Sequence, residues 1–227
     1  MALGLGLMAM LLLTLVRTDL LSGWQNSIKP DMPNRFVINI QGDQLAGVKN
    51  YFTSRNMSMP DLYPMVRGRL VEINDKAISP SNFKDERAKR TSEREFNLSW
   101  AATLQADNKV IAGKFWTPDT KEKQFSVEEG IAKTLGINLG DTLTYDIAGT
   151  RFTAKVTSLR KVEWDSFKAN FFVIASPGVL DSYPASYITS FHLPPGNEAV
   201  VNGLVKQFPN VSVIDLTAIM NQVRTIT

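Results

Sequence analysis

Residue types that could act as nucleophiles or bind metals are scarce in this chain. Its 227 residues include no cysteine and one histidine, His192. These counts exclude a thiolate nucleophile, disulfides, and metal sites built from thiolates or several histidines. A Ser/His/Asp set would depend on His192, which ends a strand-like run directly before Leu193 and two prolines, and no G-x-S-x-G motif precedes it. We therefore interpret His192 as a structural histidine at the end of a strand.

The carboxylates offer no better catalytic pair. Glu128 and Glu129 are adjacent, so their side chains diverge on a helix, and the helix dipole favours acids in a first turn. Asp141, in the segment LGINLGDTL, is typical of a turn between a helix and a strand. The sequence contains no Walker-type loop and no G-x-G-x-x-G after a strand. We predict no catalytic, cofactor-binding or metal-ligating residues, no cofactor and no enzymatic activity.

The charge distribution argues against a nucleic-acid partner. Lysine and arginine number 25 against 22 acidic residues, a net charge of +3, and the two signs are interspersed. A densely charged run, Lys84–Glu95, is typical of a solvated loop or helix face. Hydrophobic residues make up 44% of the chain, which is enough to build a folded core.

The first residues give the strongest compositional signal. Met1–Val16 carries no charge and is mostly Leu, Met, Ala and Gly. As a helix rising about 1.5 Å per residue it would span roughly 24 Å, somewhat short of a hydrocarbon core about 30 Å thick. A signal peptide would need basic residues before this run and a small-residue cleavage site after it, and neither is present. We predict the end of a transmembrane helix with Trp24 as its interfacial anchor; a signal segment and a buried core helix are the alternatives.

The last residues, Leu216–Thr227, have a helical pattern. Ile219, Met220 and Val223 recur at helical spacing, and neither glycine nor proline ends the pattern. A helix interrupted at each end of the chain predicts a piece cut from a longer membrane protein between two membrane-spanning segments. The alternative is a complete protein with a frayed terminal helix.

A strand-helix-strand unit is predicted near the beginning of the remaining sequence. Arg35–Gln41 alternates as a strand does, and Asp43 is expected to cap a helix that ends near Ser54. Leu62–Ile73 follows as a second strand, interrupted near Pro64.

A second such unit lies near the end. Ser186–Leu193 is rich in strand formers, Asn197 is expected to cap a helix that ends before Pro209, and Val211–Leu216 is a strand. Two strand-helix-strand units are the ingredients of a ferredoxin-like α+β sandwich. The residues between the two units are too many for a loop and must have structure of their own.

This intervening segment is predicted to be mostly β-structure with one helix. Ser126 and Glu129 match the capping-box pattern S-x-x-E at the start of that helix, and Gly136 would end it. Ala148-Gly149 lies between two alternating runs and suits the turn of a hairpin.

The segment Phe125–Asp181 also carries a series of motifs. It contains A-x-x-L-G-I-x-x-G-D-x-L (Ala132–Leu143), V-x-S-L-R-x-V (Val156–Val162) and N-F-F-V (Asn170–Val173), and VIAGKFW precedes it. These motifs resemble the large periplasmic domain of FtsX-like ABC transporter permeases, the MacB/LolC/LolE type. Within that family the YbbP-like predicted permeases resemble the chain most, and the likeness extends in order over most of residues 35–220.

The resemblance implies an α+β fold in which a ferredoxin-like, porter-type subdomain is split by a β-rich, Sabre-like insert. The corresponding boundaries are residues 31–75 and 184–216 for the porter-like subdomain and 76–183 for the insert. Residues 1–30 and 217–227 would be the end and the start of transmembrane or stalk helices. The family has no catalytic residues in this domain, so none are assigned.

The resemblance also implies a function. The domain would face the periplasm as part of a permease subunit in a bacterial inner membrane, and a separate cytoplasmic ABC ATPase subunit would hydrolyse ATP. Transmembrane helices would carry the resulting motion to this domain, which would move or extract a lipid-like or hydrophobic substrate, and the full-length permease would work as a dimer or pseudo-dimer. The alternative is a membrane-anchored periplasmic binding or adaptor module without transport activity.

Overall fold

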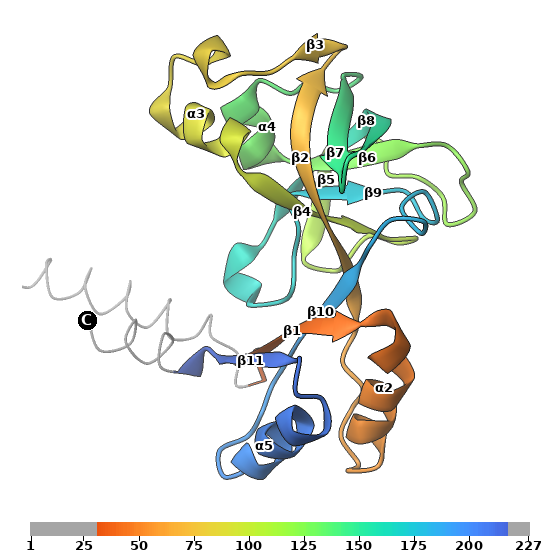
Figure 1. The fold of residues 1–227 in the computed structure, drawn as a ribbon, viewed down its shortest axis with the longest axis vertical. Helices are drawn as coiled ribbons and strands as arrows, with labels where there is room; N and C mark the ends of the chain where they lie inside the picture. Colours follow the sequence, from red (N-terminus) through yellow and green to blue (C-terminus); the bar gives the residue numbers. More distant parts are fainter. Residues whose placement is uncertain (1–30, 218–227) are drawn as a thin grey trace, which may run out of the picture.

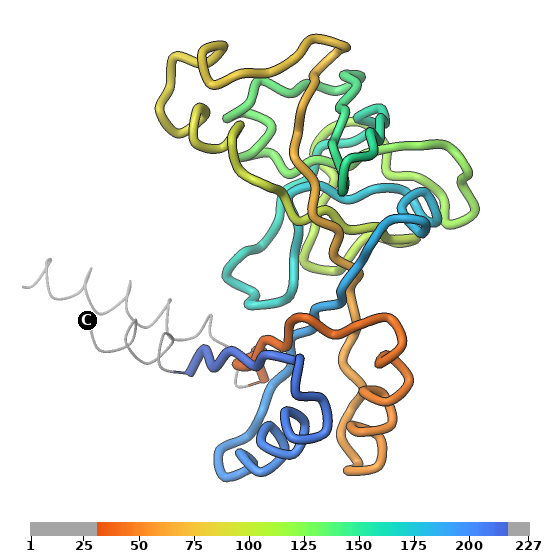
Figure 2. The backbone as a smooth tube through the Cα atoms, viewed as in Figure 1, coloured from red at the N-terminus to blue at the C-terminus, as the bar shows by residue number. Residues whose placement is uncertain are grey.

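The computed structural model describes residues 31–217, which form two lobes at opposite ends of the long axis (Figure 1). We call residues 31–62 and 186–217 the small lobe, and residues 63–185 the large lobe. Figure 2 shows the backbone passing between them twice, once in each direction.

The small lobe is an antiparallel sheet with two helices packed on one face. β1 (Arg35–Gln41) lies between β10 (Ser186–Phe191) and β11 (Ser212–Asp215). α2 (Leu45–Thr53) follows β1 after a short 3₁₀ turn, and α5 (Glu198–Gln207) connects β10 to β11. The lobe is therefore built from two segments that are far apart in the sequence.

The core of the small lobe lies between this sheet and its helices. Val48 and Phe52 of α2 and Leu204 of α5 are fully buried in one cluster with Val37 and Ile40 of β1. Fully burying a side chain of this size contributes about 1.5–3 kcal/mol. The apolar stripe of each helix thus fixes which of its faces meets the sheet.

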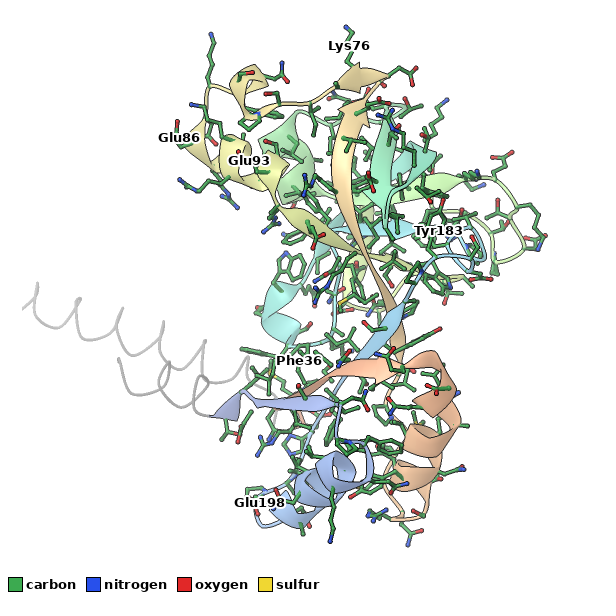
Figure 3. The ribbon with its side chains drawn as sticks, in the orientation of Figure 1. Phe36, Lys76, Glu86, Glu93, Tyr183 and Glu198 are labelled. Atoms are coloured by element: carbon green, nitrogen blue, oxygen red, sulfur yellow. The ribbon has the colours of Figure 1, made fainter. Side chains whose placement is uncertain are left out.

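The large lobe is mostly β-structure. Two helices, α3 (Glu86–Glu93) and α4 (Glu129–Leu135), pack near one end of this lobe. Figure 3 labels Glu86 and Glu93, the first and last residues of α3. Its strands are β2 (Tyr63–Ile73), β3 (Lys76–Ala77), β4 (Glu95–Trp100), β5 (Asn108–Gly113), β6 (Gln124–Glu128), β7 (Thr142–Ile147), β8 (Thr150–Val162) and β9 (Val173–Ala175).

Strand pairing links both lobes into one path. Its order is β11-β1-β10-β2-β4-β9-β6-β8-β5, with β3 paired to β2, and β7 paired to both β2 and β8. Most of the pairs are antiparallel, while β4 with β9 and β6 with β8 are parallel. The predicted α+β class is confirmed at this level.

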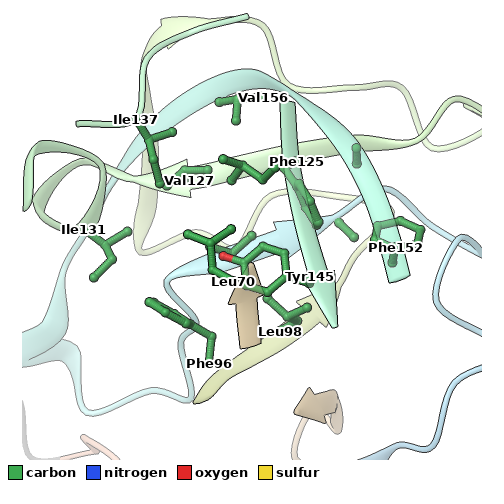
Figure 4. Close-up of a cluster of buried hydrophobic side chains, with 14 of the residues drawn as sticks. Leu70, Phe96, Leu98, Phe125, Val127, Ile131, Ile137, Tyr145, Phe152 and Val156 are labelled. Atoms are coloured by element: carbon green, nitrogen blue, oxygen red, sulfur yellow. The ribbon is translucent and has the colours of Figure 1, made fainter. Parts of the chain in front are cut away.

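Aromatic side chains fill the centre of the large lobe (Figure 4). The Phe125 ring lies 5.6 Å from the ring of Tyr145 and 5.6 Å from that of Phe152, in edge-to-face geometry in both cases. Leu70 of β2 and Leu98 of β4 are also buried in this cluster. Edge-to-face pairs add about 0.5–1.5 kcal/mol to what area burial contributes.

A third and smaller cluster lies where the lobes meet. Its buried members are Trp116, Phe171 and Ile174 of the large lobe. Tyr63 at the start of β2 and Ile188 on β10 pack against them. Since β2 pairs with β10 through its first residues and with β4 through the next ones, this one strand contributes to both lobes.

Most predicted elements are confirmed, although two predicted helix caps are wrong. A Gln41–Gln44 capping box, rather than Asp43, opens the turn before α2. Glu128, rather than Ser126, caps α4, because pairing with β8 extends β6 through Glu128 and buries Ser126 within the strand. The motif S-x-x-E (Ser126–Glu129) therefore spans the end of β6 and the first residue of α4.

The predicted interruption near Pro64 is also wrong, while the predicted hairpin is confirmed. Pro64 lies within β2, and its carbonyl accepts a hydrogen bond of 2.6 Å from the Ser99 hydroxyl. Ala148 and Gly149 connect β7 to β8 with φ values of 51° and 83°. A two-residue hairpin with positive φ at both positions matches the right-handed twist of the strands that it joins.

The segments predicted to be ends of membrane helices, residues 1–30 and 218–227, lie outside the described residues. Across residues 31–217, every helix falls short of the length and apolar character needed to cross a bilayer.

Candidate functional site

His192 lies just after β10 and directs its ring towards the beginning of the described chain. Its Nδ1 is 2.9 Å from the carbonyl oxygen of Met32, so Nδ1 carries the hydrogen and donates it. His192 lines the same cleft as Ser58 and Ser190. Within residues 31–217 it forms no hydrogen bond with a serine or a carboxylate, so the nucleophile-base contact of a catalytic triad is not assembled there.

The two adjacent glutamates have separate structural partners. Glu128 is buried, and its Oε2 accepts a hydrogen bond of 2.8 Å from the Ile131 amide at the start of α4. Glu129 lies 3.5 Å from the Lys133 ammonium group, one helical turn further on. The side chains diverge as the sequence predicts.

Asp141 closes a turn. Its Oδ2 accepts a hydrogen bond of 2.7 Å from the Asn138 amide, and its Oδ1 accepts one of 2.8 Å from the Asn74 side chain. Among residues 31–217, no group of three or more His, Cys, Asp or Glu side chains is arranged to hold a metal ion.

A buried arginine is the most unusual polar residue of the large lobe. Arg160 is fully buried on β8, and its Nη1 donates a hydrogen bond of 2.6 Å to Asn108 Oδ1 while Nη2 donates to the Phe171 carbonyl. Burial lowers the pKa of Arg160 to about 10, although the carboxylates of Glu128 and Asp107 act in the opposite direction. The guanidinium group therefore remains charged at neutral pH.

Asp107 extends this network to the surface. Its Oδ2 accepts hydrogen bonds of 2.7 Å from the Ser166 hydroxyl and 2.7 Å from the Asn170 amide group, and Asn108 donates to Oδ1 at 3.2 Å. We call Arg160, Asn108, Asp107, Asn170 and Ser166 the Asp107 network. It joins β8 to two loops that face the small lobe.

A cleft of about 1100 Å³ opens between the lobes. We call it the junction cleft. The loop after α2 and the first residues of β2 form one wall, residues 100–107 form the opposite wall, and residues 190–192 and Lys168 contribute further. Its apolar lining consists largely of Met57, Met59, Leu62, Trp100, Leu104 and Phe191, and its charged lining includes Lys49, Asp61, Asp107 and Lys168.

Hydrogen bonds fix both walls of the junction cleft. Thr189 of β10 donates its hydroxyl to the Asp61 carbonyl at 2.5 Å. On the opposite wall, Trp116 Nε1 donates to the Ala101 carbonyl at 2.8 Å and Gln105 Nε2 donates to the Ala169 carbonyl at 3.0 Å. Hydrogen bonds within the protein therefore hold the segments that form the two walls.

Tyr63, the first residue of β2, lines the junction cleft. Its ring packs edge-on against Phe171 with the centroids 6.5 Å apart. Burial raises the pKa of Tyr63 to about 12, and the neighbouring Asp61 carboxylate adds to this effect. The hydroxyl is therefore neutral at physiological pH and can act only through hydrogen bonds.

The chain is similar to an ABC transporter permease, and the predicted resemblance to permeases of this type is confirmed. The relative is the uncharacterized ABC transporter permease YbbP of Escherichia coli K12. It is 41% identical over 222 residues, which cover 98% of this chain and 26% of YbbP. The chain thus spans about a quarter of the length of the curated relative that it matches.

Two further comparisons add little. No protein-family model matches the chain. A solved domain of a protein described as a permease from Porphyromonas gingivalis aligns with a TM-score of 0.40 and 10% identity, covering 81% of this chain and 91% of that one.

Sequence reasoning did not single out the Asp107 network or the junction cleft. The sequence held one signal for the network. Side chains alternate between the two faces of β8, and Arg160 falls on the same face as the buried Phe152, Ala154 and Val156. The cleft had none, because its walls come from loops that are distant in the sequence.

Proposed function

We propose that this chain is the periplasmic domain of an ABC transporter permease subunit in a bacterial inner membrane. The observation that carries the proposal is 41% identity to a permease across 98% of the chain. His192, Glu128 and Glu129 each have a structural hydrogen-bond or ion-pair partner. A transport role is compatible with this, because it requires no catalytic use of these side chains.

In this proposal the domain consists of two subdomains. Residues 31–75 and 184–216 would form the porter-like, ferredoxin-like subdomain, and residues 76–183 the Sabre-like insert. The separate hydrophobic clusters of the two lobes and the split strand-helix-strand units support a division into two subdomains, although Val66 and Leu70 of residues 31–75 are buried in the cluster of the large lobe. Residues 1–30 and 217–227 would continue into transmembrane or stalk helices.

The small lobe is suited to receive motion from the membrane. β1 and β11 are antiparallel neighbours, so Arg35 and Asp215 lie side by side, with Nη1 and Oδ1 2.7 Å apart. The Leu216 amide also donates to the Asn34 carbonyl at 2.9 Å. Helices attached at these two points would pull on one end of one sheet.

ATP hydrolysis by a separate cytoplasmic subunit would then change how the lobes pack rather than drive chemistry within them. The permease would work as a dimer or pseudo-dimer, and its substrate would be lipid-like or hydrophobic. The mixed lining of the junction cleft supports a substrate of that class.

The orientation can be tested with one cysteine, because this chain contains none. Lys76 is exposed at the far end of the large lobe (Figure 3), so Lys76→Cys in the full-length permease offers an accessible thiol. We expect a membrane-impermeant maleimide to label it in cells with a permeabilised outer membrane and an intact inner membrane. Labelling only after the inner membrane is lysed would contradict the periplasmic orientation; the unsubstituted permease is the control.

The adaptor alternative makes a different prediction. A permease subunit should co-purify with an ABC ATPase when the full-length protein is tagged and extracted from its native membrane. An adaptor without a transport role should be recovered without one, and that result would favour the alternative.

A further inference from the structure

The junction cleft combines an apolar strip with charged side chains, next to the point where the described chain begins. Resting on the proposed function, we propose that this cleft binds a single-chain amphiphile, a molecule with one acyl chain and a charged head such as a lysophospholipid. The cleft would then hold the substrate between the two lobes.

The apolar strip has a feature that core packing does not explain. Leu104 is half-buried, yet it belongs to none of the three hydrophobic clusters and instead faces the cleft. Met57 and Met59 on the opposite wall are also half-buried: they pack against the core of the small lobe and line the cleft as well. Methionine side chains are flexible and polarisable, and they adapt to apolar ligands of variable shape. An acyl chain would cover these three side chains.

The charged part of the lining offers groups for a head. Lys49 and Lys168 are exposed, and within residues 31–217 neither forms an ion pair. By contrast, the buried Asp107 accepts hydrogen bonds from three side chains and is occupied by its own network. The two ammonium groups suit a phosphate or carboxylate, and the exposed Asp61 suits an amine on the same head.

Size and position favour an amphiphile over a small polar solute. The cleft, at about 1100 Å³, lies slightly above the range of roughly 300–1,000 Å³ that is usual for pockets holding drug-sized ligands. Asp31 and Pro33 are also part of its lining, so the cleft extends to the first described residues.

Photolabelling of the full-length permease tests the proposal. The permease would be reconstituted in phosphatidylcholine nanodiscs and titrated with lysophosphatidylethanolamine that carries a diazirine on its acyl chain. We expect saturable adducts on residues 57–64 and 100–107, located by mass spectrometry of peptides. Adducts confined to other segments, or adducts that rise linearly with probe concentration, would overturn the proposal.

A matched pair of substitutions separates binding in the cleft from nonspecific insertion. Leu104→Asp places a charge on the apolar strip without removing a core side chain, and we expect at least about a tenfold loss of adducts on both walls. Leu139→Asp makes the same change at a leucine that is 46% exposed and outside the cleft, and it should leave labelling unchanged. Equal effects of the two substitutions would refute the assignment.

The site for the charged head of the ligand is tested with a second matched pair of substitutions. Lys168→Gln should weaken labelling by the lysophospholipid and by a diazirine fatty acid alike, whereas Lys161→Gln, at an exposed lysine of β8 outside the cleft, should weaken neither. Labelling by the fatty acid alone would identify a carboxylate head, and labelling by the lysophospholipid alone a phosphate head. Labelling by both that is insensitive to Lys168→Gln would contradict the assigned head site.

Other occupants of the cleft give different results. If residues 17–30 of the chain itself filled it, the probe would leave both walls unlabelled, and the proposal would fail. Co-purification of an ATPase with the full-length permease does not depend on the cleft, so the cleft proposal can fail while the permease assignment stands.

Discussion

The two lobes share a sheet but differ in how they are held together. The large lobe has a cluster of nineteen buried hydrophobic residues with interlocked aromatic rings, while the small lobe has ten, buried between a sheet and two helices. The cluster at the junction has three buried members. Since local stability follows buried apolar contact, we expect the junction to open more readily than the core of either lobe.

The lobes also differ in how they hold a buried arginine. Arg160 of the large lobe is fully enclosed, whereas Arg35 of the small lobe is 8% exposed and pairs with Asp215, whose side chain is 55% exposed. The Asp107 network shows the reason. Arg160 is enclosed, but the side chain of Asn108 and the Phe171 carbonyl accept from it, and two buried carboxylates lie near enough to favour its charged form. Enclosing a guanidinium group completely costs more free energy than burying one whose carboxylate partner stays exposed to solvent.

The largest expected effect is therefore at Arg160. Arg160→Met should lower the free energy of unfolding by about 3 kcal/mol, because Asn108 Oδ1 and the Phe171 carbonyl lose their donor inside the lobe. Urea denaturation measures the loss. Arg160→Lys should recover little of it, since an ammonium group cannot reach two acceptors as the guanidinium fork does. Full stability of Arg160→Met would mean that the network contributes nothing to the difference between the lobes.

A smaller effect is expected in the small lobe at Gly203. A Cβ at this position on α5 would lie 2.4 Å from the hydroxyl of Tyr51, which donates to the Val200 carbonyl at 2.7 Å. Gly203→Ala should destabilise the protein by about 1 kcal/mol, because the displaced hydroxyl outweighs the helix propensity that alanine adds. Adding Tyr51→Phe to Gly203→Ala should restore part of the loss in thermal denaturation. No restoration would show that the helices are not linked through this hydrogen bond.

The smallest effect is expected at the edge of the sheet. Burial would raise the pKa of Asp215, but its hydrogen bonds with Thr217 and the charge of Arg35 outweigh this and hold the pKa below its ordinary value near 3.8. A lowered pKa in the folded state means that the ionised carboxylate contributes stability above pH 3.8, and that this contribution is lost as the pH falls through the folded-state pKa. Because the side chain is 55% exposed, Asp215→Asn should cost less than about 1 kcal/mol at pH 7. The difference between the two proteins should vanish in denaturation at pH 2.

The sequence predicted the regular parts of both lobes because their signals are local. Alternation along β1 and the positive-φ pair Ala148-Gly149 depend only on neighbouring residues. The cap of α4 was missed because a neighbouring strand, not the local pattern, decides where β6 ends. Arg160 was missed because its charge outweighed its position in the alternation of β8. The junction cleft could not be predicted, because its two walls meet only after both lobes have folded.

The pairing of β1 with β11 has a further consequence for how such a protein can be assembled over evolution. Adjacent strands lie about 5 Å apart, so the chain enters and leaves the small lobe through neighbouring points. A host protein could therefore accept this whole unit within a short surface loop without separating the ends of that loop. The same geometry applies to the large lobe, because its chain enters through β2 and leaves through β10, which are paired. The large lobe therefore interrupts the sequence of the small lobe at a pair of adjacent strands.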